Sequence, residues 1–238
     1  MSIVDCTHHV AVAYKPNLAF FEPYGAEGFS ALERIIQAIP SDCLVIADAK
    51  RGDIGSTAAQ YAVEAFERYG ADAVTLSPFM GHDSVTPYLK YKDKGVFLLC
   101  RTSNPGGDDL QNQRLMDESG TPRLFEHVAQ LAEGAWLDGG PTGQIGLVVG
   151  ATYPDEIRRV RALAPTAPLL IPGVGAQGGD AVATIQAGAT TDGLVIVNSS
   201  RAVIYASKGA DFAKAAKHVA TETRDTLNAA RDLKSDRS

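Results

Sequence analysis

Short runs of apolar, often β-branched residues recur along the chain, separated by segments with the helical period. Continuous apolar runs of this length are typical of parallel strands that are covered on both faces. The pattern predicts strands at 11–15, 43–48, 73–77, 96–101, 144–149, 168–172 and 193–197. It predicts amphipathic helices at 26–39, 56–69, 84–92, 122–137, 154–164, 179–187 and 210–231. Ser56, Thr121 and Asp180 are cap-type residues that open three of these helices.

Seven parallel strands with intervening helices favour an α/β fold of the (β/α)8 TIM barrel type over an open doubly wound sheet, mainly because of where the glycine-rich loops fall. The eighth strand is missing from the pattern. Residues 1–10 read as a helix, so we expect either that the first barrel strand precedes residue 1 or that the barrel closes irregularly. Residues 104–120 read as one long loop and no linker divides the chain, which predicts a single barrel domain over 1–238.

Composition narrows the class of protein further. A 238-residue chain with 45% hydrophobic residues can build a full core. A net charge of −6 and a pI near 5.4 argue against binding to nucleic acid or an anionic membrane surface, but not against a small anionic ligand.

The chain lacks a signal-peptide pattern and any apolar stretch of the ~20 residues that span a bilayer, so we expect a cytoplasmic protein. Neither the three cysteines nor the five histidines have metal-ligand spacing, and we expect no metal.

Charged residues follow the second predicted strand. In the run CLVIADAK, alternation places Asp48 and Lys50 on one face at the carboxyl end of the strand, where barrel enzymes have their active sites, and Asp53 follows. Lys15 ends the preceding strand, just before Asn17, and we expect it beside Asp48. Desolvating unpaired charges costs several kcal/mol, which favours a catalytic network over a purely structural ion-pair network. Flanking carboxylates favour the ammonium form of Lys50, so we expect a proton donor rather than a Schiff-base nucleophile.

A glycine-rich run, PGVGAQGGD at 172–180, follows the sixth predicted strand and opens a helix. Its backbone N–H groups, including those of Gly178 and Gly179, can surround an anion at the positive end of that helix. The next strand ends in VNSSR, which places Ser200 and Arg201 at the loop that phosphate sites in barrels commonly use. The glycine-rich run alone could be a tight turn; together with the Arg201 guanidinium it favours a phosphate site.

The run DAKRGDI at 48–54 matches the DxKxxDI signature of the orotidine 5′-monophosphate decarboxylase family. The chain resembles the longer bacterial branch of that family over nearly its whole length, including the runs AYKPNLAFFE and TSNP. The resemblance implies an enzyme that converts orotidine monophosphate to uridine monophosphate and CO₂ in de novo pyrimidine biosynthesis, with no cofactor. It implies a charged tetrad of Lys15, Asp48, Lys50 and Asp53, in which Lys50 donates the proton.

The same resemblance implies a homodimer with shared active sites and a set of substrate-binding residues. Asp53, Ile54 and Thr57 would reach into the neighbouring subunit's site. The TSNPGG loop at 102–107 has polar groups suited to a planar ring, and Ser103 would bind the pyrimidine base. The remaining contacts implied are Gln177 between base and phosphate, Pro172 and Gly173 at the hinge of a lid, and Arg201 on the phosphate.

One departure from the family concerns the start of the chain. The family begins with a strand that ends in a ribose-binding Asp, in a Gly-x-Asp-Pro-like run, and this chain shows no such strand. Two other functions therefore stay open. One is a metal-dependent sugar-phosphate aldolase or synthase of the same barrel group, in which the carboxylates of a DxKxxD run hold magnesium. The other is a catalytically inactive nucleotide-binding protein.

Overall fold

The computed structural model describes residues 1–116, 120–137, 139–174 and 179–235. The chain divides into two compact units. Unit 1 comprises residues 1–97 and 201–222, and unit 2 comprises residues 98–200 and the chain from 223 onward. The strands are β1 (Ala13–Tyr14), β2 (Leu44–Arg51), β3 (Ala73–Leu76), β4 (Gly95–Arg101), β5 (Ile145–Val149), β6 (Leu169–Pro172) and β7 (Val195–Asn198), and their order in the sheet follows the sequence. All seven predicted strands are confirmed, although β1 is shorter and β2 longer than predicted.

Helices fill the segments between the strands. They are α1 (Ser2–Thr7), α2 (Gly25–Gln37), α3 (Gly55–Val63), α4 (Thr86–Leu89), α5 (Leu124–Glu133), α6 (Pro154–Leu163), α7 (Ala181–Gly188), α8 (Arg201–Ile204) and α9 (Phe212–Ser235). Short 3₁₀ turns are η1 (Leu18–Phe20), η2 (Glu22–Tyr24), η4 (Pro78–Met80), η5 (His82–Ser84) and η6 (Pro105–Asp109), and the π-helical turn η3 (Glu64–Arg68) extends α3. The helix at the start of the chain is confirmed as α1.

The extent of one helix and two of the predicted caps need correction. The segment 84–92 forms only the short helix α4, because Pro87 allows a first turn but the chain then leaves the helix at Lys90. Of the predicted caps, Asp180 is the N-cap of α7, with Oδ1 accepting a hydrogen bond from Ala183 N at 3.0 Å. Ser56 lies inside α3, and Arg123 rather than Thr121 precedes α5.

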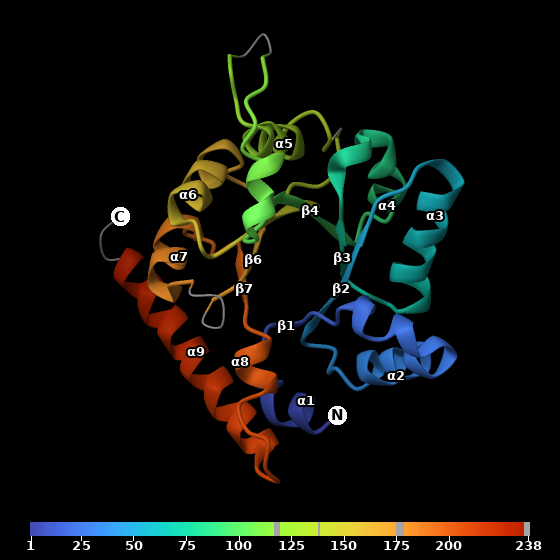
Figure 1. Cartoon of the computed structure of the whole chain (residues 1–238), viewed down its shortest axis with the longest axis vertical. Helices are drawn as coiled ribbons and strands as arrows, with labels where there is room; N and C mark the ends of the chain where they lie inside the picture. Colours follow the sequence, from blue (N-terminus) through green and yellow to red (C-terminus); the bar gives the residue numbers. More distant parts are fainter. Residues whose placement is uncertain (117–119, 138, 175–178, 236–238) are drawn as a thin grey trace. The chain divides into compact units, whose positions relative to one another are not determined.

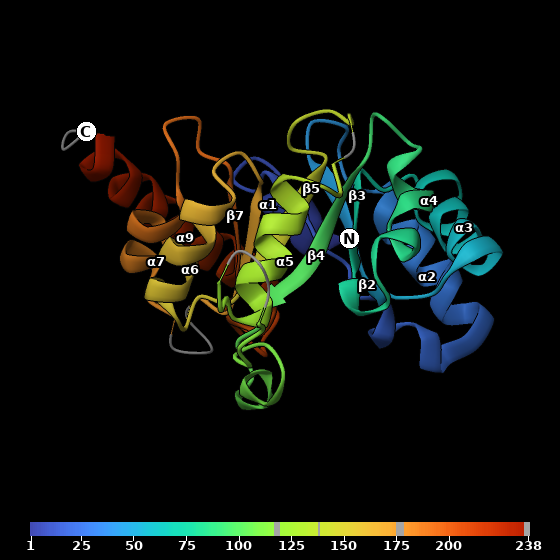
Figure 2. The ribbon, with the colours of Figure 1, turned by 90° about the horizontal axis from the view of Figure 1, so that it is seen from above.

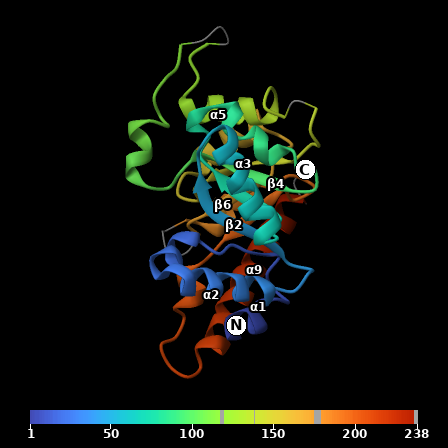
Figure 3. The ribbon, with the colours of Figure 1, turned by 90° about the vertical axis from the view of Figure 1, so that its right-hand side faces the viewer.

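Unit 1 contains the parallel strands β1, β2 and β3, with β2 in the middle. Helices α2, α3 and α4 lie on one side of β2 and β3 (Figures 1 and 2), and α3 covers β2 when unit 1 is seen from the side (Figure 3). The buried residues Gly28, Leu32 and Ile36 recur every four positions along α2 and form its core-facing stripe. Gly28 is required there because a Cβ would lie 1.9 Å from the carbonyl oxygen of Phe21.

Unit 2 contains the parallel strands β5, β6 and β7. All five residues of β5 are buried, as expected for a parallel strand covered on both faces. Helices α6 and α7 lie side by side against these strands (Figures 1 and 2). Among the described residues, no helix is long and apolar enough to cross a membrane.

Candidate active site

The Asp48 carboxylate lies at the centre of a charge cluster in unit 1. It is 5% exposed, and its Oδ2 accepts a hydrogen bond from Lys15 Nζ at 2.5 Å. Its Oδ1 forms an ion pair with Lys50 Nζ, whose side chain is 47% exposed. Burial raises the pKa of Asp48, but the two ammonium groups outweigh that effect and hold the pKa below its usual value. The cluster is therefore a buried carboxylate kept ionised by two lysines.

An irregularity in β2 brings Asp48 and Lys50 together. Ala47 pairs with Val74 and Arg51 pairs with Leu76, so the three residues Asp48 to Lys50 face a single residue of β3. Lys50 has a φ of 47°, in the left-handed region that residues other than glycine rarely adopt. Asp48 and Lys50 were predicted to share a face through regular alternation along the strand. Instead a β-bulge brings them together, and β-bulges are often found beside active sites.

Asn17 approaches the same carboxylate from the end of β1. Its Nδ2 lies 3.4 Å from Asp48 Oδ2, and the Asp48 N–H donates to Pro16 O at 3.0 Å. Asn17 Oδ1 accepts from Ala19 N at 3.0 Å and so caps the turn η1. Lys15 and Asn17 are thus placed at Asp48 by the parallel pairing of β1 with β2.

Thr75 is a site residue that the sequence reasoning missed. It is 1% exposed on β3, and its Oγ1 donates to Asp48 Oδ1 at 3.0 Å. The same oxygen accepts from the N–H groups of Ala49 and Lys50, at 3.0 and 2.9 Å. A threonine inside an apolar strand carries no signal of this role in the sequence, because the role depends on the bulge in the neighbouring strand.

Asp53, Ile54 and Thr57 lie beyond the end of β2 and are not part of the cluster around Asp48. Asp53 Oδ1 accepts a hydrogen bond from Ile54 N at 2.8 Å, and no contact among the described residues joins the Asp53 carboxylate to Lys15 or Lys50. Ile54 is 47% exposed and Thr57 is also exposed. The fourth member of the predicted tetrad is thus separate from the other three within one chain.

Ser103 is the second residue of the loop that follows β4, and Gly150, just after the end of β5, fixes its position. A Cβ on Gly150 would lie 2.7 Å from the Cβ of Ser103 and 2.9 Å from its backbone N. Gly150 N also donates to Arg101 O at 2.7 Å. A side chain at residue 150 therefore cannot coexist with this position of Ser103, a constraint that the sequence reasoning did not find.

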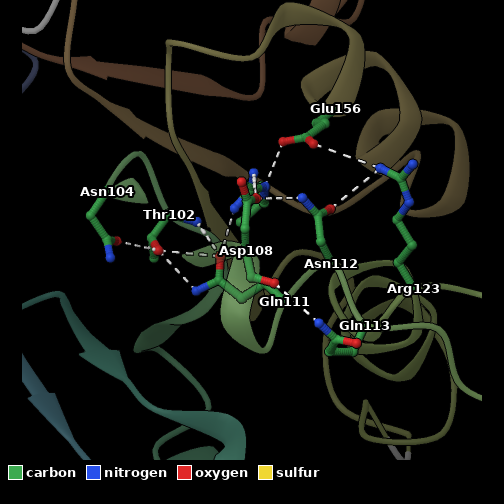
Figure 4. Close-up of polar contacts among 9 residues, drawn as sticks. Thr102, Asn104, Asp108, Gln111, Asn112, Gln113, Arg123 and Glu156 are labelled. Carbon is green, nitrogen blue, oxygen red and sulfur yellow. Dashed lines mark hydrogen bonds and ion pairs between the residues drawn. The ribbon is translucent and has the colours of Figure 1, made fainter. Parts of the chain in front are cut away.

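A buried guanidinium holds the rest of this loop. Arg101 is 1% exposed and donates to Glu156 and to Asp108, both at 2.6 Å. Gln111 Oε1 accepts from Thr102 N at 2.9 Å, so the loop is bonded back onto its own first residue. Figure 4 shows these polar side chains pointing toward one another within unit 2. The predicted long loop at 104–120 is therefore held at Asp108 and Gln111 by hydrogen bonds to Arg101 and Thr102.

The glycine-rich run after β6 is closed at its described ends. Gly173 has a φ of 103°, which suits glycine alone, and its carbonyl accepts from Gly179 N at 3.2 Å. Pro172 is the last residue of β6. Gln177 and Gly178 lie outside the described residues. The N–H of Gly179 is bonded to Gly173 O, and the N–H of Ala183 in the first turn of α7 is bonded to Asp180 Oδ1, so an anion held here would use donors other than these two N–H groups.

Ser200 and Arg201 lie where β7 gives way to α8. Ser200 Oγ accepts a hydrogen bond from Asn198 Nδ2 at 3.2 Å. Arg201 is exposed, and its guanidinium forms no ion pair with any described residue. A phosphate-binding role for Arg201 stays a prediction.

The cysteines and the candidate metal ligands form no further site within the described part of the chain. Cys6, Cys43 and Cys100 are free thiols, and Cys43 and Cys100 are buried. No group of three or more His, Cys, Asp or Glu side chains among the described residues could hold a metal ion.

Charged side chains at the carboxyl ends of parallel strands, in a chain where helices follow the strands, define this protein as a (β/α)-barrel enzyme. Residues 1–217 match the model of the orotidine 5′-phosphate decarboxylase / HUMPS family. The chain belongs to that family, which confirms the resemblance seen in the run DAKRGDI.

Named relatives and a solved structure agree with this assignment. The chain is 64% identical over 233 residues to the orotidine 5′-phosphate decarboxylase of Polaromonas naphthalenivorans (strain CJ2), covering 97% of this chain and 81% of the relative. It is 64% identical over 231 residues to the protein of that name from Paracidovorax citrulli (strain AAC00-1), covering 97% and 83%. The structure of Leishmania donovani OMP decarboxylase is 46% identical, with a TM-score of 0.83, over 96% of this chain and 85% of that chain. The expected barrel class is confirmed, with seven strands among the described residues.

Proposed function

We propose that this protein is an orotidine 5′-phosphate decarboxylase, which converts orotidine monophosphate to uridine monophosphate and CO₂ in pyrimidine biosynthesis. The observation that carries the proposal is the buried Asp48 carboxylate between the ammonium groups of Lys15 and Lys50. A loss of CO₂ from C6 of a pyrimidine leaves an electron pair on carbon with nothing in the ring to delocalise it. A fixed ammonium group next to that carbon supplies both the opposite charge and a proton.

In the proposed reaction the bond between C6 and the carboxylate carbon breaks, and its electron pair stays on C6. Lys50 stabilises this charge and donates a proton from Nζ to C6, and solvent then reprotonates the amine. Asp48, kept ionised by Lys15, holds the Lys50 ammonium in place and faces the departing carboxylate. This reaction needs no cofactor, because the Lys50 ammonium group supplies both the stabilising charge and the proton that C6 receives.

Substrate contacts are proposed from the family pattern. Ser103 binds the pyrimidine base, and its fixed position against Gly150 supports a role in orienting that base. Arg201 binds the phosphate, for which its exposed guanidinium, which forms no ion pair with a described residue, is suited. The remaining proposed contacts are Asn17, Pro172, Gly173, Gln177, Gly178 and Ser200, whereas the Gly179 N–H is already bonded to Gly173 O.

The test follows the absorbance of orotidine monophosphate as it is consumed. Lys50→Ala should lower kcat by at least about 10²–10⁴-fold, the usual contribution of a general acid, while uridine monophosphate still binds. Arg201→Ala should instead weaken nucleotide binding by about 10–100-fold, the value of a lost charged hydrogen bond. Lys92→Ala, at an exposed lysine of unit 1, is the matched control. Full turnover by Lys50→Ala would refute the proposed mechanism.

We also propose a homodimer in which Asp53, Ile54 and Thr57 complete the partner's site. The isolation of Asp53 from the Asp48 cluster and the exposure of Ile54 and Phe79, at 47% and 79%, support a partner surface near these residues. Mixing Lys50→Ala with Asp53→Ala protomers tests it. Each mixed dimer would contain one site with both residues intact, so a randomly mixed sample should regain about a quarter of the wild-type sites. No recovery in mixed dimers would contradict shared sites.

A metal-dependent sugar-phosphate synthase is the competing function, since the family description also includes the HUMPS group. Both oxygens of Asp48 are already occupied, Oδ1 by Lys50 and Thr75 and Oδ2 by Lys15 and Asn17. A carboxylate bonded in this way is not a free ligand for magnesium. Turnover of orotidine monophosphate that survives a chelator would favour the decarboxylase. An inactive nucleotide-binding protein would instead bind uridine monophosphate and consume no orotidine monophosphate.

The negative net charge and the small anionic substrate together support a cytoplasmic enzyme that binds neither nucleic acid nor a membrane surface. Fractionation of cells that express the tagged protein checks this placement.

A further inference from the structure

The bulge in β2 leaves backbone groups without their usual partners. Between the pairs Ala47 with Val74 and Arg51 with Leu76, three residues of β2 face Thr75 alone. A single residue of β3 cannot pair its backbone with three residues in regular ladder geometry. The N–H groups of Ala49 and Lys50 are partly shielded from water, so they must be bonded in another way, because an unpaired N–H inside a sheet destabilises the fold.

The Thr75 hydroxyl fills this gap. A hydroxyl offers one donor and two acceptor positions, and all three are used here. It accepts from Ala49 N at 3.0 Å and from Lys50 N at 2.9 Å, and it donates to Asp48 Oδ1 at 3.0 Å. Since Thr75 is 1% exposed, bulk water has no access to replace these bonds.

Lys50 needs this support more than an ordinary strand residue does. Its φ of 47° is a backbone conformation that persists in a non-glycine residue only where the surroundings enforce it. The Lys50 side chain is 47% exposed and makes its ion pair with the carboxylate that Thr75 also bonds. The Thr75 hydroxyl therefore bonds the backbone N–H of Lys50 directly and its ammonium group through the Asp48 carboxylate.

We propose that Thr75 is a positioning residue for the decarboxylation: its hydroxyl holds the β2 bulge in the conformation that directs the Lys50 ammonium group and the Asp48 carboxylate at the reacting carbon. This inference rests on the proposed function, because it assigns Lys50 the proton-donating role. Thr75 acts through Lys50 and Asp48 and touches no substrate.

Thr75→Val is the decisive variant, because it keeps the shape of the side chain and removes only the hydroxyl. We expect kcat for orotidine monophosphate to fall by about 10–100-fold, as expected for a misplaced catalytic group, with KM and the affinity for uridine monophosphate within about twofold of wild type. Thr75→Ser keeps the hydroxyl and should recover most of the turnover that Thr75→Val loses. This split between kcat and KM, with rescue by serine, is not expected from a residue that only fills the core.

Thr184→Val is the matched control. Thr184 is also fully buried, but its Oγ1 has no hydrogen-bond partner among the described residues, so its replacement removes no bond. If Thr75→Val does not fold, Thr75→Cys replaces the hydroxyl by a weakly bonding thiol of similar size and should show the same loss in kcat. Wild-type kcat in a folded Thr75→Val or Thr75→Cys protein would overturn the inference. Absence of turnover by the wild-type protein would overturn the proposed function instead, so the two failures are distinguishable.

Discussion

Replacing Gly150 by alanine tests how closely unit 2 controls the residue proposed to bind the base. In the structure a Cβ at residue 150 would lie 2.7 Å from Ser103 Cβ and 2.9 Å from Ser103 Cα and N. Non-bonded carbon atoms rest at about 3.5–4.0 Å, so Ser103 must move by about 1 Å. The movement cannot be absorbed by a side-chain rotation alone, because two of the three close atoms belong to the backbone.

The size of the effect follows from this displacement. A lost hydrogen bond to the base, worth about 0.5–1.5 kcal/mol, should raise KM for orotidine monophosphate by about 2–10-fold. Misplacement of the substrate by about 1 Å can lower kcat by up to about 10²-fold. Overpacking of this kind should also lower the free energy of unfolding by about 1–3 kcal/mol.

Initial rates over a range of orotidine monophosphate concentrations give kcat and KM, and urea unfolding gives the free energy of unfolding. Gly106→Ala is the matched control in the same loop, because a Cβ there meets nothing closer than 3.5 Å. If Gly150→Ala had the kinetic constants of Gly106→Ala, the reasoning that Gly150 positions Ser103 would be refuted.

Two further predictions concern stability. Because the folded pKa of Asp48 lies below its usual value near 4, its ion pairs stabilise the fold fully above that pH and less as the pH falls through the folded pKa. The difference in free energy of unfolding between wild type and Asp48→Asn, measured in urea, should therefore shrink as the pH falls below about 4, the usual pKa of an aspartate; a constant difference would contradict it. Arg161 donates to five backbone carbonyls, at 2.7–3.1 Å, so Arg161→Lys should cost about 3 kcal/mol or more in urea unfolding. Arg158→Lys, at an exposed arginine paired only with exposed Asp155 among the described residues, should change stability by less than about 0.5 kcal/mol, and equal effects would show that the carbonyl contacts do not matter.

Local patterns in the sequence were sufficient to predict the strands and most helices. Buried parallel strands are continuous apolar runs, and this signal lies within each segment. The helix predicted at 84–92 is confirmed only over Thr86–Leu89, where Pro87 lies in the first turn and the helix ends at Lys90. The position of Lys15 at the end of the preceding predicted strand also predicted its approach to Asp48, since parallel neighbours end at the same edge of a sheet.

The arrangement within the site could be predicted only in part. Alternation along β2 predicted that Asp48 and Lys50 meet, and they do, but through a bulge with a left-handed Lys50. The strand run itself shows no glycine or proline at residue 50 that would signal such a backbone. Its conformation depends on bonds from Thr75, a residue 25 positions further along the chain.

The amino-acid sequence by itself determined the order of strands and helices, the charged residues at the strand ends and the family to which the chain belongs, because each is encoded in contiguous residues. The tertiary structure alone decided that Thr75 holds the bulge, that Gly150 leaves room for Ser103 and that Asp53 stands apart from Asp48. The first two features arise from contacts between residues distant in sequence, where close packing and buried hydrogen bonds allow only one arrangement, and the third follows from the path of the chain beyond β2. A pattern read along the chain does not contain them.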